Sequence, residues 1–200
     1  MLTLDGHHSA LLSIDFQRDI ALRDGALAPK DEPALARFDK AMECGVRALS
    51  TARALDLLVV HVRLAFRPGH ASVNRRSPVG RFFAETNALL EGAEGTEFVP
   101  ELAPTAEEII VTKRGVSAFA GSDLEMILKQ RSIDTVILMG LVTHFAVEGT
   151  ARDAFERGYG VVTLADCCAS GGETRHDASI DILERIGEVT TSASLAASIA

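Results

Sequence analysis

The chain has 200 residues, of which 47% are hydrophobic and 24% charged, as in an ordinary globular domain rather than a disordered or fibrous chain. Its 20 lysines and arginines against 28 aspartates and glutamates give a formal net charge of −8. This balance argues against a nucleic-acid-binding surface and against a basic membrane-surface helix. The composition therefore predicts one globular domain over residues 1–200, with neither a nucleic acid nor a membrane as its partner.

The N-terminal segment, residues 1–8, lacks the basic start and the apolar core of a signal peptide. No apolar run approaches the roughly 18 to 20 residues that a membrane span needs. We therefore expect a cytoplasmic protein, in which Cys44, Cys167 and Cys168 are reduced thiols. Their spacing also lacks the paired ligands of a structural zinc site.

Short runs rich in leucine and β-branched residues predict strands at 10–15, 57–63, 108–112, 135–139 and 160–164. Helical spacing predicts helices at 34–55, 123–131, 145–157 and 176–185, with a short helix near 80–90, a final strand near 188–191 and an alanine-rich terminal helix. Apolar strands alternating with helices are typical of a parallel sheet covered on both faces. The sequence therefore predicts an α/β fold of three αβα layers, doubly wound and Rossmann-like, with a mostly parallel six-stranded sheet.

Ligands of such sheets bind beyond the carboxyl ends of the strands, where Asp15 and Lys113 are expected. A carboxylate at such a strand end can act as a general acid or base when burial raises its pKa, although it can equally cap a loop. The Lys113 ammonium can favour the charged form of Asp15 and stabilise developing negative charge. A lone lysine at a strand end is more often simply solvated.

Residues 140–154 turn from a strand into a helix at Thr143, which we expect to be the helix N-cap. Position 146 then lies in the first helical turn, where unpaired amides and the helix dipole favour negative charge. This place suits a cysteine nucleophile of low pKa with backbone N–H groups as an oxyanion hole. The residue at this position is Ala146.

A series of motifs in a fixed order makes the chain resemble the isochorismatase-like family, also called the cysteine hydrolases, over about residues 10–170. The motifs are Leu-Ser-Ile-Asp15-Phe-Gln17, Val60-His-Val-Arg63 with Phe66-Arg-Pro-Gly69, Val111-Thr-Lys113-Arg-Gly-Val-Ser117-Ala-Phe119, Gly140-Leu-Val-Thr143, Gly149-Thr-Ala-Arg-Asp-Ala154 and Asp166-Cys-Cys-Ala-Ser170. Each motif alone is weak, but their common order is specific.

The resemblance implies a catalytic aspartate, lysine and cysteine at Asp15, Lys113 and position 146. It also implies an oxyanion hole made by the N–H groups of Val142 and Ala146, a cis peptide bond near Leu141 and Val142, and a homodimer or homotetramer. In the family's amidases the aspartate takes the thiol proton, the thiolate attacks a carbonyl carbon to form a thioester, and the lysine supports the charge. Because a methyl group cannot attack a carbonyl, Ala146 excludes this covalent cycle in the chain as it stands.

Three explanations of Ala146 stay open. Our principal hypothesis is a C–N hydrolase of a small amide, carbamoyl or ureido compound, inactivated by a deliberate Cys→Ala replacement. An isochorismatase would instead use Asp15 as a general acid on a vinyl ether, and water would attack the resulting cation. A homologue without catalysis would bind a ligand or a partner. Cys167 and Cys168 follow the predicted fifth strand and are weak candidates for the missing thiol.

An arginine beside aromatic walls suits a small planar substrate with a carboxylate or carbamoyl end, although each phenylalanine is also explained by core packing. The family's nicotinamidases hold a metal through an Asp-x-His motif after the second strand, and residues 61–70 lack this motif. We therefore expect neither a metal nor another cofactor. The side chains expected along the substrate are Phe16, Gln17, Arg63, Phe66, Arg67, Phe119, Thr143, His144 and Phe145.

Overall fold

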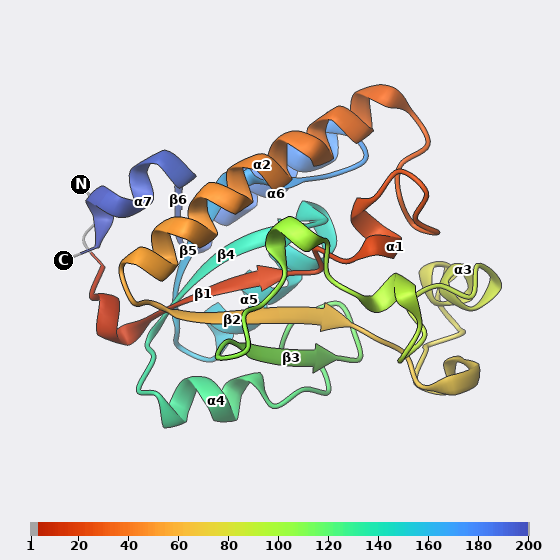
Figure 1. Cartoon of the computed structure of the whole chain (residues 1–200), viewed down its shortest axis with the longest axis horizontal. Helices are drawn as coiled ribbons and strands as arrows, with labels where there is room; N and C mark the ends of the chain where they lie inside the picture. The colour runs from red at the N-terminus through yellow and green to blue at the C-terminus, as the bar shows by residue number, and fades with distance from the viewer. Residues whose placement is uncertain (1–3, 200) are drawn as a thin grey trace.

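The computed structural model describes residues 4–199, so residues 1–3 of the N-terminal segment and residue 200 lie outside the described part. A six-stranded sheet of order β3-β2-β1-β4-β5-β6 forms the centre, and all neighbouring strands are parallel (Figure 1). The strands are β1 (Ser9–Ile14), β2 (Leu58–Leu64), β3 (Ile109–Lys113), β4 (Thr135–Leu141), β5 (Gly160–Ala169) and β6 (Glu188–Thr190).

Helices cover both faces of the sheet. One apolar cluster joins the sheet to α2 (Glu32–Ala54) and α7 (Ser192–Ser198). The opposite cluster joins it to α4 (Leu124–Gln130), α5 (Glu148–Glu156) and α6 (Glu173–Ile186). The long connections carry α1 (Arg18–Ala21) and α3 (Pro78–Glu85), and short turns are η1 (Gly6–His8), η2 (Pro68–His70), η3 (Glu94–Thr96), η4 (Pro100–Leu102) and the π-helical η5 (Thr143–Val147). The predicted three-layer αβα fold is thus confirmed.

The burial of the central strands explains why apolar runs in the sequence predicted them. Every residue of β1 is buried, and its alternate side chains enter opposite clusters, as Leu11 and Leu12 do. Strands buried on both faces read as continuous apolar runs. None of the helices described over residues 4–199 is long and apolar enough to cross a bilayer.

Two predicted boundaries at the carboxyl ends of strands were wrong. The strand β5 runs to Ala169, well beyond the predicted 160–164, because Cys168 and Ala169 still pair with the end of β4. The predicted helix 145–157 is divided into the π-helical turn η5 and the helix α5. Thr143 is not the N-cap, since Val142 occupies that position and the Thr143 hydroxyl lies 2.9 Å from Nδ1 of His176.

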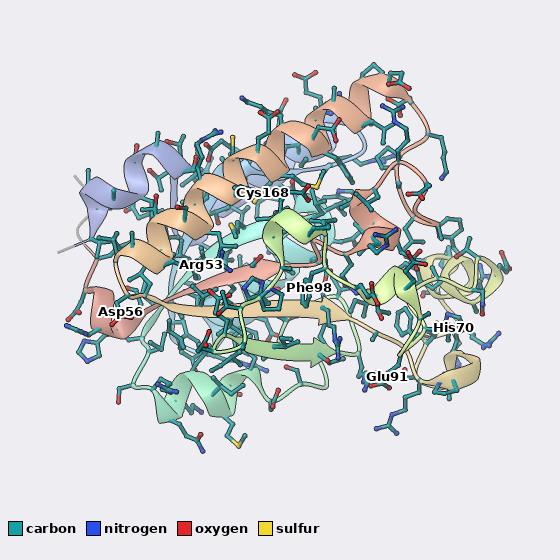
Figure 2. All side chains as sticks on the ribbon, in the orientation of Figure 1. Arg53, Asp56, His70, Glu91, Phe98 and Cys168 are labelled. Atoms are coloured by element: carbon teal, nitrogen blue, oxygen red, sulfur yellow. The ribbon has the colours of Figure 1, made fainter. Side chains whose placement is uncertain are left out.

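A polar cluster around the buried His61 anchors the start of β3. The Glu108 carboxylate lies 2.7 Å from Nη2 of Arg53 and 3.0 Å from Nε2 of His61. The His61 ring meets Phe98 edge-on, with the ring centroids 5.5 Å apart; Arg53 and Phe98 are labelled in Figure 2. The hydrogen bond from Arg53 holds the pKa of Glu108 at about 2, while burial lowers the pKa of His61. The carboxylate is therefore charged and the imidazole neutral at neutral pH.

The Glu108 cluster predicts a specific loss of stability in acid. Since the pKa in the folded protein, about 2, lies below the usual 4.5, the stabilisation is present above that usual value and is lost as the pH falls toward 2. We expect Glu108→Gln to lower the free energy of unfolding at neutral pH by about 1 to 3 kcal/mol and to weaken the acid dependence. Urea unfolding across this pH range measures both effects, and equal stability of the two proteins at neutral pH would refute the prediction.

Candidate active site

A cavity of about 720 Å³ opens at the carboxyl ends of the central strands. Asp15 follows β1, Lys113 ends β3, and Val142 and Ala146 follow β4; all of them line this cavity. Ligand sites of parallel sheets lie at this edge because the intervening loops converge there. The fold thus brings together the three positions that the resemblance assigns to catalysis.

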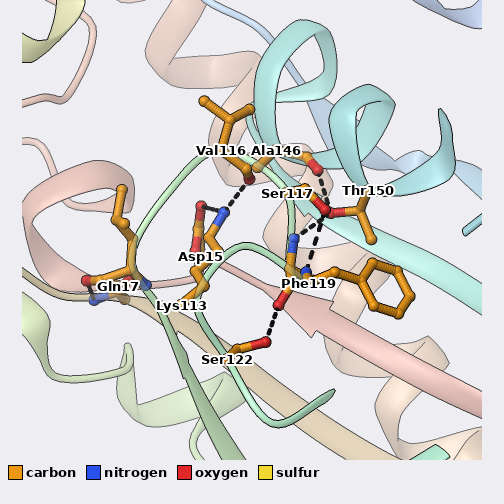
Figure 3. A network of polar contacts seen from close by, with 11 residues as sticks. Asp15, Gln17, Lys113, Val116, Ser117, Phe119, Ser122, Ala146 and Thr150 are labelled. Carbon is orange, nitrogen blue, oxygen red and sulfur yellow. Dashed lines mark hydrogen bonds and ion pairs between the residues drawn. The ribbon is translucent and has the colours of Figure 1, made fainter. Parts of the chain in front are cut away.

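Asp15 and Lys113 form a buried ion pair at this edge. The Lys113 Nζ lies 2.8 Å from Oδ2 of Asp15 and donates a hydrogen bond of 2.6 Å to the Val116 carbonyl oxygen (Figure 3). The two side chains are only 1% and 4% exposed, respectively for lysine and aspartate. The other aspartate oxygen, Oδ1, has no hydrogen-bond partner within residues 4–199. One carboxyl oxygen is therefore held by the lysine, and the other can exchange a proton with a bound molecule.

Burial raises the pKa of Asp15, and the Lys113 ammonium opposes that rise. Desolvation favours the neutral acid, whereas the neighbouring positive charge favours the carboxylate. A carboxyl group under these two opposing influences can both accept and return a proton, which is what a general acid–base catalyst must do.

The backbone at this edge is unusual in two places. Asp15 adopts φ 57°, a left-handed conformation that aspartate tolerates better than most residues. Gly140 on β4 passes so close to β1 that a Cβ on it would lie 2.3 Å from the Ile14 carbonyl oxygen. Only glycine fits there, and it lets β4 approach the strand that presents Asp15.

Ala146 lies in the π-helical turn η5, and it is 4% exposed. The peptide bond between Leu141 and Val142, just before this turn, is cis. The Ala146 N–H donates to the Val142 carbonyl oxygen at 3.0 Å, and the Phe145 N–H donates to the same oxygen at 3.1 Å. The Ala146 amide expected in an oxyanion hole is thus already hydrogen-bonded in this structure, and an oxyanion would have to share it.

A polar network links the turn around Ala146 to the loop that follows Lys113 (Figure 3). The buried Thr150 hydroxyl donates to the Ala146 carbonyl oxygen at 2.6 Å and accepts the Ala118 N–H at 2.9 Å. Nearby, the Ser117 hydroxyl donates to Asp153 of α5 at 2.7 Å. Since the Val116 carbonyl that binds Lys113 belongs to this loop, the network positions the lysine relative to residue 146.

Three of the side chains expected along the substrate line the cavity: Phe66, His144 and Phe145. The Nδ1 of His144 lies 2.8 Å from the Ser170 hydroxyl. Burial is the main cause that lowers the pKa of His144, and the positive charge of Arg175 lowers it further. The imidazole is therefore neutral at neutral pH.

The other expected side chains do not line the cavity, for physical reasons. Phe16 is fully buried in the cluster under α2, and Phe119 packs against Tyr159 at a centroid distance of 6.0 Å. Gln17 is also fully buried. Its side-chain amide donates a hydrogen bond to the Leu64 carbonyl oxygen and accepts one from the Leu64 N–H, so both polar ends are already used.

Arg63, Arg67 and Thr143 likewise lie away from the cavity lining. Arg63 donates to the Thr112 hydroxyl at 3.0 Å across neighbouring strands. Arg67 is exposed, and Thr143 is turned toward His176. The expected arginines therefore do not supply the positive charge of the site.

Two other arginines and an aromatic wall of the cavity were not predicted from the sequence. Arg114 and Arg175 line the cavity, as do Phe82 and Phe83 of α3. Arg114 directly follows Lys113, so the rule of strand ends applies to it as well. Arg175 lies in the first turn of α6, beyond the end of β5, which was predicted too early. Asp166 lies within β5, where it accepts hydrogen bonds from Ser192.

No cysteine lies in this cavity. Cys44, Cys167 and Cys168 are buried and unbridged, and none of them lines it. Burial raises the pKa of Cys167 far above its usual range and that of Cys168 to about 12. Within residues 4–199 no group of three or more His, Cys, Asp and Glu side chains is placed to hold a metal ion.

The thiols of the folded protein are accordingly expected to be inert. At neutral pH we expect iodoacetamide to leave all three unmodified, because they are buried and protonated. Mass spectrometry of the intact protein and of its peptides measures the labelling, with urea-unfolded protein as the positive control. Rapid modification of Cys167 or Cys168 in the folded protein would instead point to an accessible, reactive thiol.

The comparisons with known proteins agree with this geometry. The family model described as "Isochorismatase domain" matches residues 9–194. The isochorismatase family protein YwoC of Bacillus subtilis is 30% identical over 95% of this chain and 93% of its own. The maleamate amidohydrolase of Pseudomonas putida is 29% identical over 93% of this chain and 84% of its own.

Solved structures give the same result. A cysteine hydrolase from Pseudomonas syringae pv. phaseolicola superposes with a TM-score of 0.87 at 25% identity, over 98% of this chain and 94% of its own. The N-carbamoylsarcosine amidase of Thermoplasma acidophilum superposes with a TM-score of 0.74 at 26% identity, over 92% of this chain and 96% of its own. The chain therefore belongs to the isochorismatase family of hydrolases, with amidohydrolases among its relatives.

Proposed function

We propose that the cavity binds a small amide, carbamoyl or ureido compound and that its chemistry is the hydrolysis of a C–N bond. The observation that carries this proposal is the buried Asp15–Lys113 ion pair, which lines the same cavity as residue 146. The names of the relatives support the substrate class, since they include a maleamate amidohydrolase and an N-carbamoylsarcosine amidase.

In this proposal Asp15 exchanges the proton, Lys113 stabilises charge, and position 146 is the place of the nucleophile. A thiol at position 146 would give its proton to Asp15, and the thiolate would attack the carbonyl carbon to form a tetrahedral oxyanion. Collapse of this intermediate, with Asp15 returning the proton to the leaving nitrogen, would release ammonia or an amine and leave a thioester for water to hydrolyse. With Ala146 the first bond cannot form, so we propose that this chain is impaired in the covalent cycle.

The direct test is Ala146→Cys. We expect this variant to release ammonia from at least one member of a panel of small amides, carbamoyl and ureido compounds, whereas the unaltered protein releases none. The chemical reason is that the variant supplies the nucleophile that the methyl group cannot. A coupled ammonia assay measures both proteins.

A matched control adds Asp15→Asn to Ala146→Cys. We expect the double variant to be inactive, because the amide of asparagine cannot accept the thiol proton. Absence of ammonia release from the single variant on every compound would refute the amidase proposal, provided that thermal unfolding shows it to be folded.

The isochorismatase alternative is favoured by one observation, the burial of the Asp15 side chain, which is only 4% exposed, because burial raises the pKa of its carboxyl group. A protonated Asp15 would donate its proton to the terminal carbon of a vinyl ether. Water would then add to the resulting oxocarbenium ion, and the hemiketal would collapse to pyruvate and an alcohol. This route needs no thiol.

Release of pyruvate from isochorismate by the unaltered protein tests this alternative. If Asp15 is the general acid, we expect pyruvate release that is lost in Asp15→Asn and that falls as the pH rises above the raised pKa of the carboxyl group. A lactate dehydrogenase assay measures the product. If the unaltered protein forms no pyruvate, the alternative is wrong.

We also propose a cytoplasmic location and a homodimer or homotetramer, as the resemblance implies.

A further inference from the structure

We propose that Arg175 makes this cavity select substrates that carry a carboxylate. This inference rests on the proposed function, because it concerns the same cavity and names a feature of its substrate. It begins from the charges on the lining. Asp15 is the one acidic side chain among the lining residues, whereas Lys113, Arg114 and Arg175 are basic. In a chain of net charge −8 the cavity is thus locally positive, which favours the entry of anions.

Two of these three cations already have partners. The Lys113 ammonium is held by Asp15 and by the Val116 carbonyl oxygen. The Arg114 guanidinium donates to the Ala65 carbonyl at 2.7 Å and to the Glu91 carboxylate at 2.9 Å. Neither group can turn to a ligand without breaking an existing interaction.

Arg175 is an exposed residue at the cavity lining, and its guanidinium makes no hydrogen bond or ion pair with residues 4–199. A guanidinium presents paired N–H donors that match the two oxygens of a carboxylate. Since no protein carboxylate has taken this place, the donors of Arg175 are available to a ligand.

The position of Arg175 relates it to the reacting end of the cavity. It lies in the first turn of α6, after a loop that Arg37 holds by a hydrogen bond of 2.9 Å to the Gly171 carbonyl oxygen. Arg175 lines the same cavity as His144 and Ala146 of the π-helical turn. A carboxylate bound by Arg175 would therefore leave the rest of a small substrate inside the cavity that residue 146 lines.

Most of the remaining lining is apolar, including Phe66, Phe83 and Leu89. Such walls accommodate the carbon skeleton of a ligand but offer a carboxylate no hydrogen bonds. Ser72, Asn74 and Ser77 also line the cavity, but they carry no positive charge. We therefore expect the negative group of the substrate at Arg175 and the skeleton at the aromatic wall.

The test uses two alkylating agents of similar size, anionic iodoacetate and neutral iodoacetamide, on the Ala146→Cys variant. In both reactions the thiolate displaces iodide and forms a thioether, so the ratio of the two rates reports how strongly the cavity favours the anion. We expect Arg175→Gln, added to Ala146→Cys, to lower the ratio of the iodoacetate rate to the iodoacetamide rate by about threefold to tenfold at low ionic strength. Peptide mass spectrometry confines the measurement to position 146.

The matched control is Arg185→Gln in the same background. Arg185 is an exposed arginine in the last turn of the same helix and does not line the cavity, so this change removes one positive charge without touching the site. We expect it to leave the ratio unchanged. An unchanged ratio in Arg175→Gln, or an equal fall in both variants, would overturn the proposal. Because alkylation needs no turnover, failure of the Arg175 inference is distinguishable from failure of Ala146→Cys to hydrolyse amides.

Discussion

The cavity depends on an ion pair that is almost completely removed from water, between Asp15 and Lys113. Burying two charges is costly, and the loss of one partner of such a pair typically costs about 3 to 5 kcal/mol. The fold offsets the cost with a 2.8 Å contact and with a second acceptor for the ammonium, the Val116 carbonyl oxygen. The Thr150 network then holds that carbonyl's loop against the helix that follows Ala146. A pair of this kind places a proton acceptor and a positive charge together at a buried part of the cavity lining.

The layers and the catalytic edge could be predicted because the buried strands leave a simple pattern. The apolar run of β1 ends at Asp15, and that of β3 ends at Lys113, so the parallel topology places both residues at one edge. The walls of the cavity could not be predicted in the same way. Phe119 packs in the core and Phe83 lines the cavity because of the way in which the long connections between the strands fold. Loop sequences have no hydrophobic periodicity from which this folding could be predicted.

Arg175 also lines the cavity without having been predicted from the sequence. Asp166 interrupts the apolar pattern near the end of β5, but Cys168 and Ala169 still pair with β4, so the loop after them begins later than predicted. Gln17 lies away from the cavity lining for a different reason. Its side chain replaces backbone hydrogen bonds at the end of β2, a structural role that motif position alone does not distinguish from substrate binding.

Our central claim is that the Asp15–Lys113 pair and position 146 form one electrostatic site. The most direct measurement is the pH dependence of iodoacetamide alkylation in Ala146→Cys, compared with the same variant carrying Lys113→Met. An ordinary cysteine titrates at about pH 8.5, and a nearby ammonium stabilises its thiolate. We predict that removal of the ammonium shifts the midpoint of alkylation upward by about one pH unit or more. Superimposable profiles from two folded variants would contradict the claim.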